Sequence, residues 1–104
     1  MHLYVLKLEQ EKYYIGISND EKRINNHFNG NGSSWTKKYK PLSIIEKIDN
    51  ADKNIEREMT LKYMKLYGWR NVRGAGWTGI EIYCPSELRE SIASYSQNSS
   101  APKV

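Results

Sequence analysis

Two tyrosines, an arginine, a histidine and a glutamate are the side chains whose types and spacing could do chemistry together. Arg23 and His27 stand four residues apart, so a helix would place both on one face. A guanidinium matches two phosphate oxygens, and a carboxylate such as Glu56 is a natural ligand for Mg²⁺. The hydroxyls of Tyr4 and Tyr14 can orient a water or accept its proton. Such a set suits metal-assisted hydrolysis of a phosphodiester.

The two tyrosines lie in segments that alternate like β-strands. In residues 3–8 the side chain of Tyr4 shares one face with Leu6 and Leu8, and residues 12–17 alternate again after a short polar break. This pattern predicts an antiparallel hairpin in which Tyr14 and Gly16 lie on one face of the second strand. Because the pKa of a free tyrosine is near 10, either hydroxyl needs a lowered pKa or a metal-linked water to act as a base.

Capping residues and apolar spacing predict the remaining elements. A helix should begin at residues 18–20 and end near Asn29, with Ile24 and Phe28 facing the core. We expect a third strand over 42–48 and a helix that ends at Gly68.

That second helix should span residues 53–67, and it is followed by an extended piece over 80–83 and a helix over 85–95. We therefore predict one α+β domain over residues 1–95, a three-stranded antiparallel sheet flanked by helices. Residues 96–104 should form a disordered tail.

Two glutamates on the second long helix compete for the role of metal ligand. An apolar stripe runs along the helix through Ile55, Met59, Tyr63, Leu66 and Tyr67. At about 100° per residue, Glu56 lies within this stripe and Glu58 lies well off its centre. A carboxylate inside an apolar stripe costs free energy unless something binds it. Glu56 is therefore the predicted ligand and Glu58 the alternate, whose other role would be a surface charge near Lys62.

The ordered set resembles the signature of the GIY-YIG nuclease family. Tyr14-Ile15-Gly16 matches the second triplet outright, whereas His2-Leu3-Tyr4 stands where the family has Gly-Ile-Tyr, so only the tyrosine is kept. The family places an arginine and a histidine one turn apart on the next helix and a glutamate on a later one, as Arg23, His27 and Glu56 stand here.

Segments near Trp35 and Trp69 also resemble small phage- and virus-borne members, and the resemblance covers roughly residues 2–79. It implies an endonuclease that acts on DNA with Mg²⁺ or Mn²⁺. In that enzyme Arg23 would hold the scissile phosphate, and Tyr4 would be the general base or would position the water. Tyr14 and His27 would orient water and phosphate.

A run of aromatic and cationic residues offers a surface for nucleic acid. Its cations and rings could contact phosphates and bases, and its members are Trp35, Lys37, Lys38, Tyr39 and Lys40. The alternative interpretation is a sheet edge that lysines protect from further pairing.

Net charge and composition limit the class of protein. The net charge of +4 permits a polyanionic partner, and the single cysteine, Cys84, excludes an internal disulfide and a zinc site built from cysteines. We expect Cys84 to be a small buried residue. No apolar run is long enough for a membrane span or secretory signal, so a cytoplasmic protein with no membrane partner is predicted.

Two other functions are compatible with the same residues. A non-catalytic nucleic-acid-binding module could keep the fold, because the missing Gly-Ile before Tyr4 leaves room for a displaced tyrosine. A protein-interaction domain could use the Trp and Tyr side chains, and it would show no salt-sensitive binding to DNA. Little chain follows residue 80 for a separate specificity domain, which favours low selectivity, a homodimer or a separate specificity protein.

Overall fold

A mixed four-stranded sheet forms the centre of the molecule. The structure, a computed structural model, describes residues 1–88. The strands stand in the order β3-β1-β2-β4, with bounds β1 His2–Leu8, β2 Tyr13–Ser18, β3 Pro41–Ile48 and β4 Val72–Gly74. The strand β1 pairs antiparallel with β2 and β3, whereas β4 runs parallel to β2. The α+β class is confirmed, and the sheet has one strand more than the three predicted.

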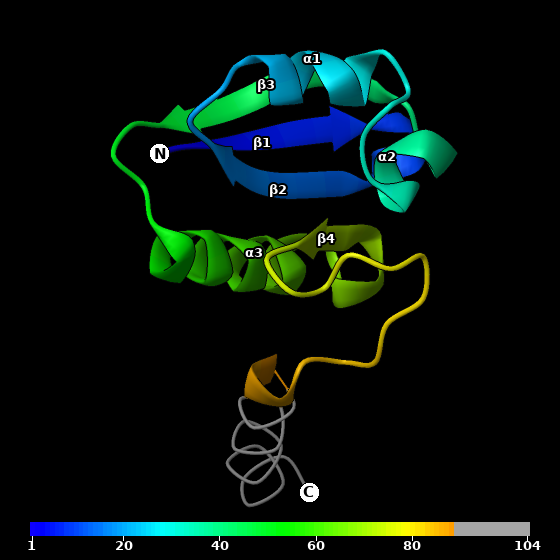
Figure 1. Ribbon diagram of the computed structural model, residues 1–104. Helices are drawn as coiled ribbons and strands as arrows, with labels where there is room; N and C mark the ends of the chain where they lie inside the picture. Colours follow the sequence, from blue (N-terminus) through cyan, green and yellow to red (C-terminus); the bar gives the residue numbers. More distant parts are fainter. Residues whose placement is uncertain (89–104) are drawn as a thin grey trace, which may run out of the picture.

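Helices cover both faces of this sheet (Figure 1). Their bounds are α1 Lys22–Phe28, α2 Ser34–Lys38 and α3 Lys53–Tyr67, and two short 3₁₀ turns are η1 Glu9–Glu11 and η2 Trp69–Asn71. Side chains alternate along a strand, so the hairpin of β1 and β2 supplies a core to each face. One core lies toward α3 and contains Leu3, Val5 and Ile15. The other lies toward α1 and α2 and contains Tyr4, Tyr14 and Trp35.

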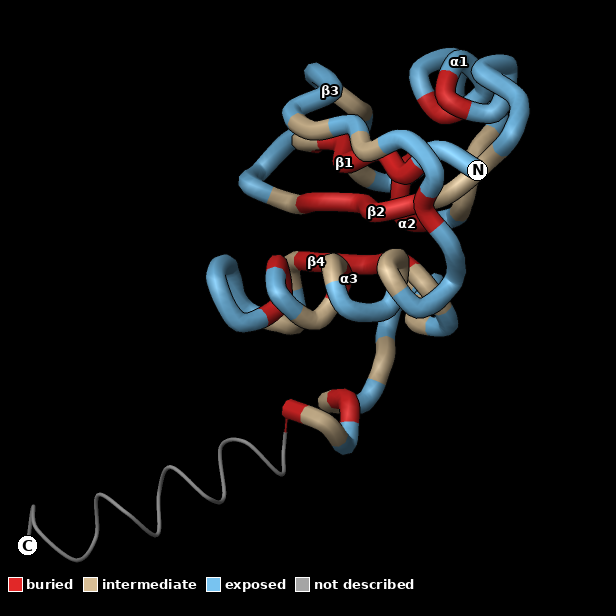
Figure 2. The backbone as a smooth tube through the Cα atoms, turned by 90° about the vertical axis from the view of Figure 1, so that its left-hand side faces the viewer, coloured by how far each residue is buried: buried red, intermediate tan, exposed pale blue. Residues whose placement is uncertain are grey.

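Buried backbone follows β1, β2 and β4, while the outer surfaces of the helices are exposed (Figure 2). The helix α3 begins and ends as predicted, because the Asp52 side chain accepts from the Ile55 amide and Gly68 takes a positive φ of 92°. The helix α1 begins slightly later than predicted, at Lys22, whose amide donates to Asp20 Oδ1.

Several local predictions are wrong. Phe28, predicted to face the core, is 40% exposed, and Leu66 of the apolar stripe is 62% exposed. The segment 34–38 is helical, so the sheet-edge interpretation of the lysines fails. Residues 80–83 form no strand. The predicted helix over 85–95 is described only to residue 88, and the predicted tail over 96–104 lies outside the described residues.

Candidate active site

Tyr4 and Gly16 face each other across the hairpin and create the space in which the site forms. They are partners in the β1–β2 register. A Cβ atom on Gly16 would lie 2.5 Å from the Tyr4 hydroxyl oxygen and 3.1 Å from Tyr14. The glycine of the Tyr-Ile-Gly triplet therefore leaves room for the Tyr4 ring, and no larger residue fits without moving it.

His27 joins α1 to the tyrosines. Its Nε2 lies 3.1 Å from the Tyr4 hydroxyl oxygen, and its ring centroid lies 4.7 Å from that of Tyr14. Its Nδ1 lies 3.0 Å from Thr36 Oγ1 on α2. The backbone of Gly32 packs against the imidazole so closely that a Cβ atom there would overlap it. His27 is consequently buried and held from both sides.

A cleft of about 230 Å³ opens beside these groups; its lining consists of Tyr14, Arg23, His27 and the polar residues Asn26, Asn31, Gly32 and Ser33. Arg23 is exposed at its mouth. Tyr4 is completely buried, whereas Tyr14 is 6% exposed and lines the cleft. Of the two tyrosines, Tyr14 therefore presents surface to a ligand, and Tyr4 lies behind it.

The positive charge of Arg23 influences the pKa of each of the other four predicted site residues. Burial raises the pKa of Tyr4 and of Tyr14, and the positive charge of Arg23 opposes both shifts. Burial lowers the pKa of His27 to about 4, and Arg23 lowers it further, so the imidazole is neutral at neutral pH. Burial raises the pKa of Glu56, and the charge of Arg23 opposes that rise. The predicted residues thus come together from β1, β2, α1 and α3.

Glu56 carries the carboxylate of this cluster. Burial raises its pKa, while the Ala75 backbone amide and the charges of Lys53 and Arg23 oppose the rise. Its negative charge raises the pKa of both Tyr4 and Tyr14. Glu58 is exposed and lines a different hollow of the surface, with Lys62 and Lys65. Of the two glutamates, Glu56 is the one whose charge raises the pKa of Tyr4 and Tyr14.

The donor set fits a hard divalent cation. Within residues 1–88 no three His, Cys, Asp or Glu side chains lie close enough to enclose a metal ion. One half-buried carboxylate beside phenolic oxygens remains, and Mg²⁺ is commonly held by one or two carboxylates with waters and substrate phosphate oxygens. The set therefore suits Mg²⁺ or Mn²⁺ bound together with a phosphate, and it does not suit zinc.

The predicted nucleic-acid segment divides into buried and exposed parts. Lys37, Lys38 and Lys40 are exposed, and Tyr39 is half-buried. Trp35 is only 2% exposed, and its Nε1 donates to the Tyr13 carbonyl oxygen at 3.0 Å. Trp35 therefore offers little surface to a base, because its ring is part of the core.

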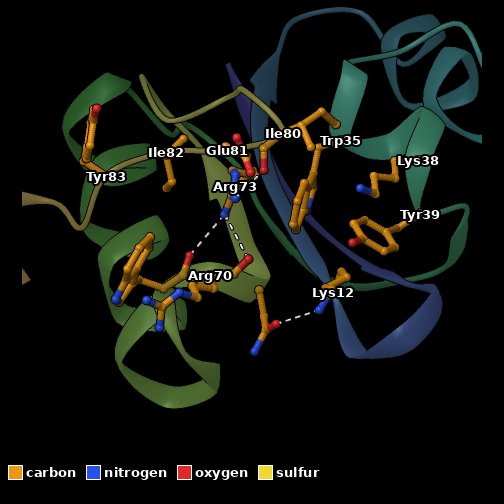
Figure 3. A pocket seen from close by; sticks show the side chains of 12 residues that line it. Lys12, Trp35, Lys38, Tyr39, Arg70, Arg73, Ile80, Glu81, Ile82 and Tyr83 are labelled. Carbon is orange, nitrogen blue, oxygen red and sulfur yellow. Dashed lines mark hydrogen bonds between the residues drawn. The ribbon is translucent and has the colours of Figure 1, made fainter.

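A groove of about 810 Å³ lies along this segment (Figure 3). Its cations and rings come from separate parts of the chain; the lining includes Lys12, Lys38, Tyr39, Trp69, Arg70 and Arg73. The Arg73 guanidinium lies 4.0 Å from the Trp35 ring centroid and donates to backbone carbonyl oxygens, among them those of Gly79 and Ile80. Arg73 therefore holds the 79–80 loop.

Sequence reasoning missed the residues around His27 and much of the groove. Thr36 and Gly32 contact the imidazole, and the Gly-Ser-Ser-Trp-Thr run at the start of α2 was the available signal. Lys12 and Arg70 join the groove through the fold rather than through any local pattern. Within residues 1–88, no helix is long and apolar enough to cross a membrane.

Comparison with known proteins agrees with this architecture. The model of the GIY-YIG catalytic domain matches residues 1–68. A UPF0213 protein of Xanthomonas campestris pv. campestris is 40% identical over 91 residues, which cover 85% of this chain and 84% of the relative. A UPF0213 protein of Staphylococcus saprophyticus is 33% identical over 64 residues, 59% of this chain and 78% of the relative. No solved structure matches the chain. The chain belongs to the GIY-YIG family, whose catalytic domain is of the nuclease type.

Proposed function

We propose that this protein is a divalent-metal-dependent endonuclease that hydrolyses phosphodiester bonds of DNA. One observation carries the proposal: Tyr14, Arg23 and His27 line one cleft, Tyr4 is hydrogen-bonded to His27 behind it, and the charge of Glu56 acts on both tyrosines. A guanidinium, a carboxylate and phenolic hydroxyls are the groups that phosphodiester hydrolysis requires.

Arg23 is the phosphate-binding residue of this proposal. It is exposed at the mouth of the cleft, so its forked donors can meet two oxygens of the scissile phosphate. Glu56 would hold Mg²⁺ or Mn²⁺, which supplies a water of lowered pKa and stabilises negative charge on the phosphate. The raised pKa of Glu56 supports this role, because a bound cation would offset the cost of its burial.

Tyr14 is the hydroxyl that meets the attacking water. It lines the cleft, whereas Tyr4 has no exposed surface, so the direct contact expected of Tyr4 is reassigned to Tyr14. Tyr4 acts from behind, hydrogen-bonded to His27 at 3.1 Å. With a pKa of about 4, His27 carries no charge at neutral pH and orients Tyr4 rather than attracting the phosphate.

The 810 Å³ groove is the proposed path of the DNA beyond the cut. Lys12, the residue before β2, lines the groove, and Tyr14, two residues further on, lines the cleft. We propose that the DNA passes from the cleft to the groove along this end of β2. Lys38 lies 5.7 Å from the Tyr39 ring centroid, and Arg70 lies 4.6 Å from that of Trp69, so cations and rings alternate along its walls (Figure 3). Phosphates and bases would meet these two kinds of group.

A plasmid-nicking assay tests the proposal. The wild-type protein should nick supercoiled plasmid with Mg²⁺ or Mn²⁺ and stop when EDTA is added. A protein that binds DNA with a salt-dependent affinity but never nicks it, with either metal, would instead be the non-catalytic binding module with this fold. Absence of salt-dependent DNA binding would remove both functions and favour a protein-interaction domain.

A further inference from the structure

A buried chain of hydrogen bonds runs into α2 from the catalytic cluster, the proposed set of Tyr4, Tyr14, Arg23, His27 and Glu56. It links the Tyr4 hydroxyl oxygen to His27 Nε2 at 3.1 Å, then His27 Nδ1 to Thr36 Oγ1 at 3.0 Å. Thr36 Oγ1 in turn lies 3.1 Å from the carbonyl oxygen of Ser33. Exposure of Tyr4, His27 and Thr36 is 0%, 2% and 1%, so solvent does not supply alternative partners.

The last link of this chain fixes the direction of the others. A carbonyl oxygen can only accept, so the bond to Ser33 uses the one proton of the Thr36 hydroxyl. The Thr36 oxygen, which the Ser33 hydroxyl oxygen also approaches at 3.3 Å, is then left to accept from His27 Nδ1. A neutral imidazole has one N–H, so Nε2 is left without a proton and accepts from the Tyr4 hydroxyl.

We propose that Thr36 is a positioning residue that holds His27 in the Nδ1–H tautomer and thereby decides which side of the Tyr4 hydroxyl faces the catalytic cluster. With this tautomer the Tyr4 hydroxyl donates its proton to His27 Nε2. The lone pairs of the Tyr4 oxygen then remain free to accept hydrogen bonds from the side of Tyr14. With the opposite tautomer, Nε2–H would donate to Tyr4, and the Tyr4 proton would turn toward the cluster as a competing donor.

The surrounding backbone supports a dedicated role for α2. The Ser33 side chain accepts from the Thr36 amide, so the first turn of α2 is capped and the Thr36 hydroxyl is held in place. Gly32 packs beside the same Nδ1 edge of the imidazole, where a Cβ atom would overlap the ring. Within residues 1–88 every buried side-chain nitrogen and oxygen has a hydrogen-bond partner, so the network is complete without further groups.

Two substitutions at Thr36 separate this role from simple packing. Thr36→Val keeps the shape of the side chain and removes the hydroxyl, whereas Thr36→Ser keeps the hydroxyl and removes the methyl. In Thr36→Val the Nδ1–H would have no acceptor, which should shift the imidazole toward the Nε2–H tautomer and lower the single-turnover nicking rate about 10- to 100-fold. Thr36→Ser should retain the tautomer and stay within about threefold of wild type.

The tautomer itself is measured by NMR of protein with ¹⁵N-labelled histidine, without DNA or metal. The chain has two histidines, and a His2→Gln variant assigns the signals. We expect Nδ1 protonated and Nε2 unprotonated in the wild type and Thr36→Ser, and a shifted or mixed state in Thr36→Val. An Nε2–H wild type, or an unchanged tautomer in Thr36→Val, would overturn the inference.

The role of Tyr4 in this inference rests on the proposed nuclease function, but the two can fail separately. If the expected tautomers are observed and the wild type never nicks DNA, the positioning of His27 stands and the nuclease function fails. If the wild type nicks DNA and Thr36→Val is as fast as wild type, Thr36 has no positioning role in catalysis and the nuclease function stands.

Discussion

Gly16→Ala should displace Tyr4 with little change to the rest of the fold. The new Cβ atom would lie 2.5 Å from the Tyr4 hydroxyl oxygen and 2.6 Å from Cζ, and ordinary van der Waals contact begins at 3.4 Å. The end of the Tyr4 side chain must therefore retreat by about 1 Å. Its hydrogen bond to His27, now 3.1 Å, would lengthen beyond useful range if the tyrosine moves away from the imidazole.

The effect on activity should exceed the effect on stability. Overpacking in a core typically costs about 1 to 3 kcal/mol, which a domain of this kind can tolerate. A misplacement of about 1 Å at a reacting group can cost on the order of 10²-fold in rate. We therefore expect Gly16→Ala to fold, with a lower melting temperature, and to nick plasmid about 100-fold more slowly in single-turnover experiments.

Gly76→Ala is the matched control for this prediction. No atom lies within 4 Å of the Cβ position at Gly76, so the same chemical change should leave both the melting temperature and the nicking rate close to wild type. If Gly16→Ala retained full activity with an intact fold, the position of the Tyr4 hydroxyl would not matter for catalysis, and the reasoning about this network would be refuted.

Three further changes test the electrostatics of the site and the groove. Arg23→Lys keeps the charge but removes the forked donors, so single-turnover nicking should fall about 10²- to 10³-fold, and near-normal turnover would show that diffuse charge is sufficient. The pKa of His27 is lowered from 6.5 to about 4 in the folded protein, so between these pH values the unfolded state binds a proton at His27 more readily than the folded state does. About 3 kcal/mol of folding stability should therefore be lost as the pH falls through this window. Urea unfolding of His27→Gln across that range should lack this part of the slope, and identical slopes in the two proteins would contradict the low pKa. Replacing the exposed Lys37, Lys38 and Lys40 by Gln should weaken DNA binding more than it slows single-turnover chemistry. In fluorescence anisotropy without metal, removing each lysine that touches a phosphate should reduce the magnitude of the log-affinity against log-salt slope by about 0.9, so an unchanged slope would place these lysines away from DNA.

Local patterns in the sequence predicted the parts of the fold that local forces determine. Alternation predicted the hairpin and the shared face of Tyr14 and Gly16, and the caps at Asp52 and Gly68 predicted both ends of α3. The strand β4 escaped prediction because it has three residues and depends on a parallel partner distant in sequence. Such a pairing leaves no periodic signal in a glycine-rich segment.

The candidate site shows the same division between local and tertiary information. Spacing placed Arg23 and His27 on one helix, and the apolar stripe favoured Glu56 over Glu58, which agrees with the action of Glu56 on the tyrosines. Burial could not be predicted from these patterns. The complete burial of Tyr4 and the near-complete burial of Trp35 follow from how α2 packs on the sheet, which tertiary packing decides.

The most direct test of the central claim compares Glu56→Gln with Glu58→Gln. Both substitutions remove one negative charge and keep the size of the side chain, and they stand two residues apart on α3. Calorimetry with Mn²⁺ and plasmid nicking should be measured on each folded variant. We predict that Glu56→Gln abolishes metal binding and metal-dependent nicking, while Glu58→Gln retains both. Full activity in Glu56→Gln would contradict the proposed metal site, and its combination with an inactive Glu58→Gln would move the ligand to Glu58.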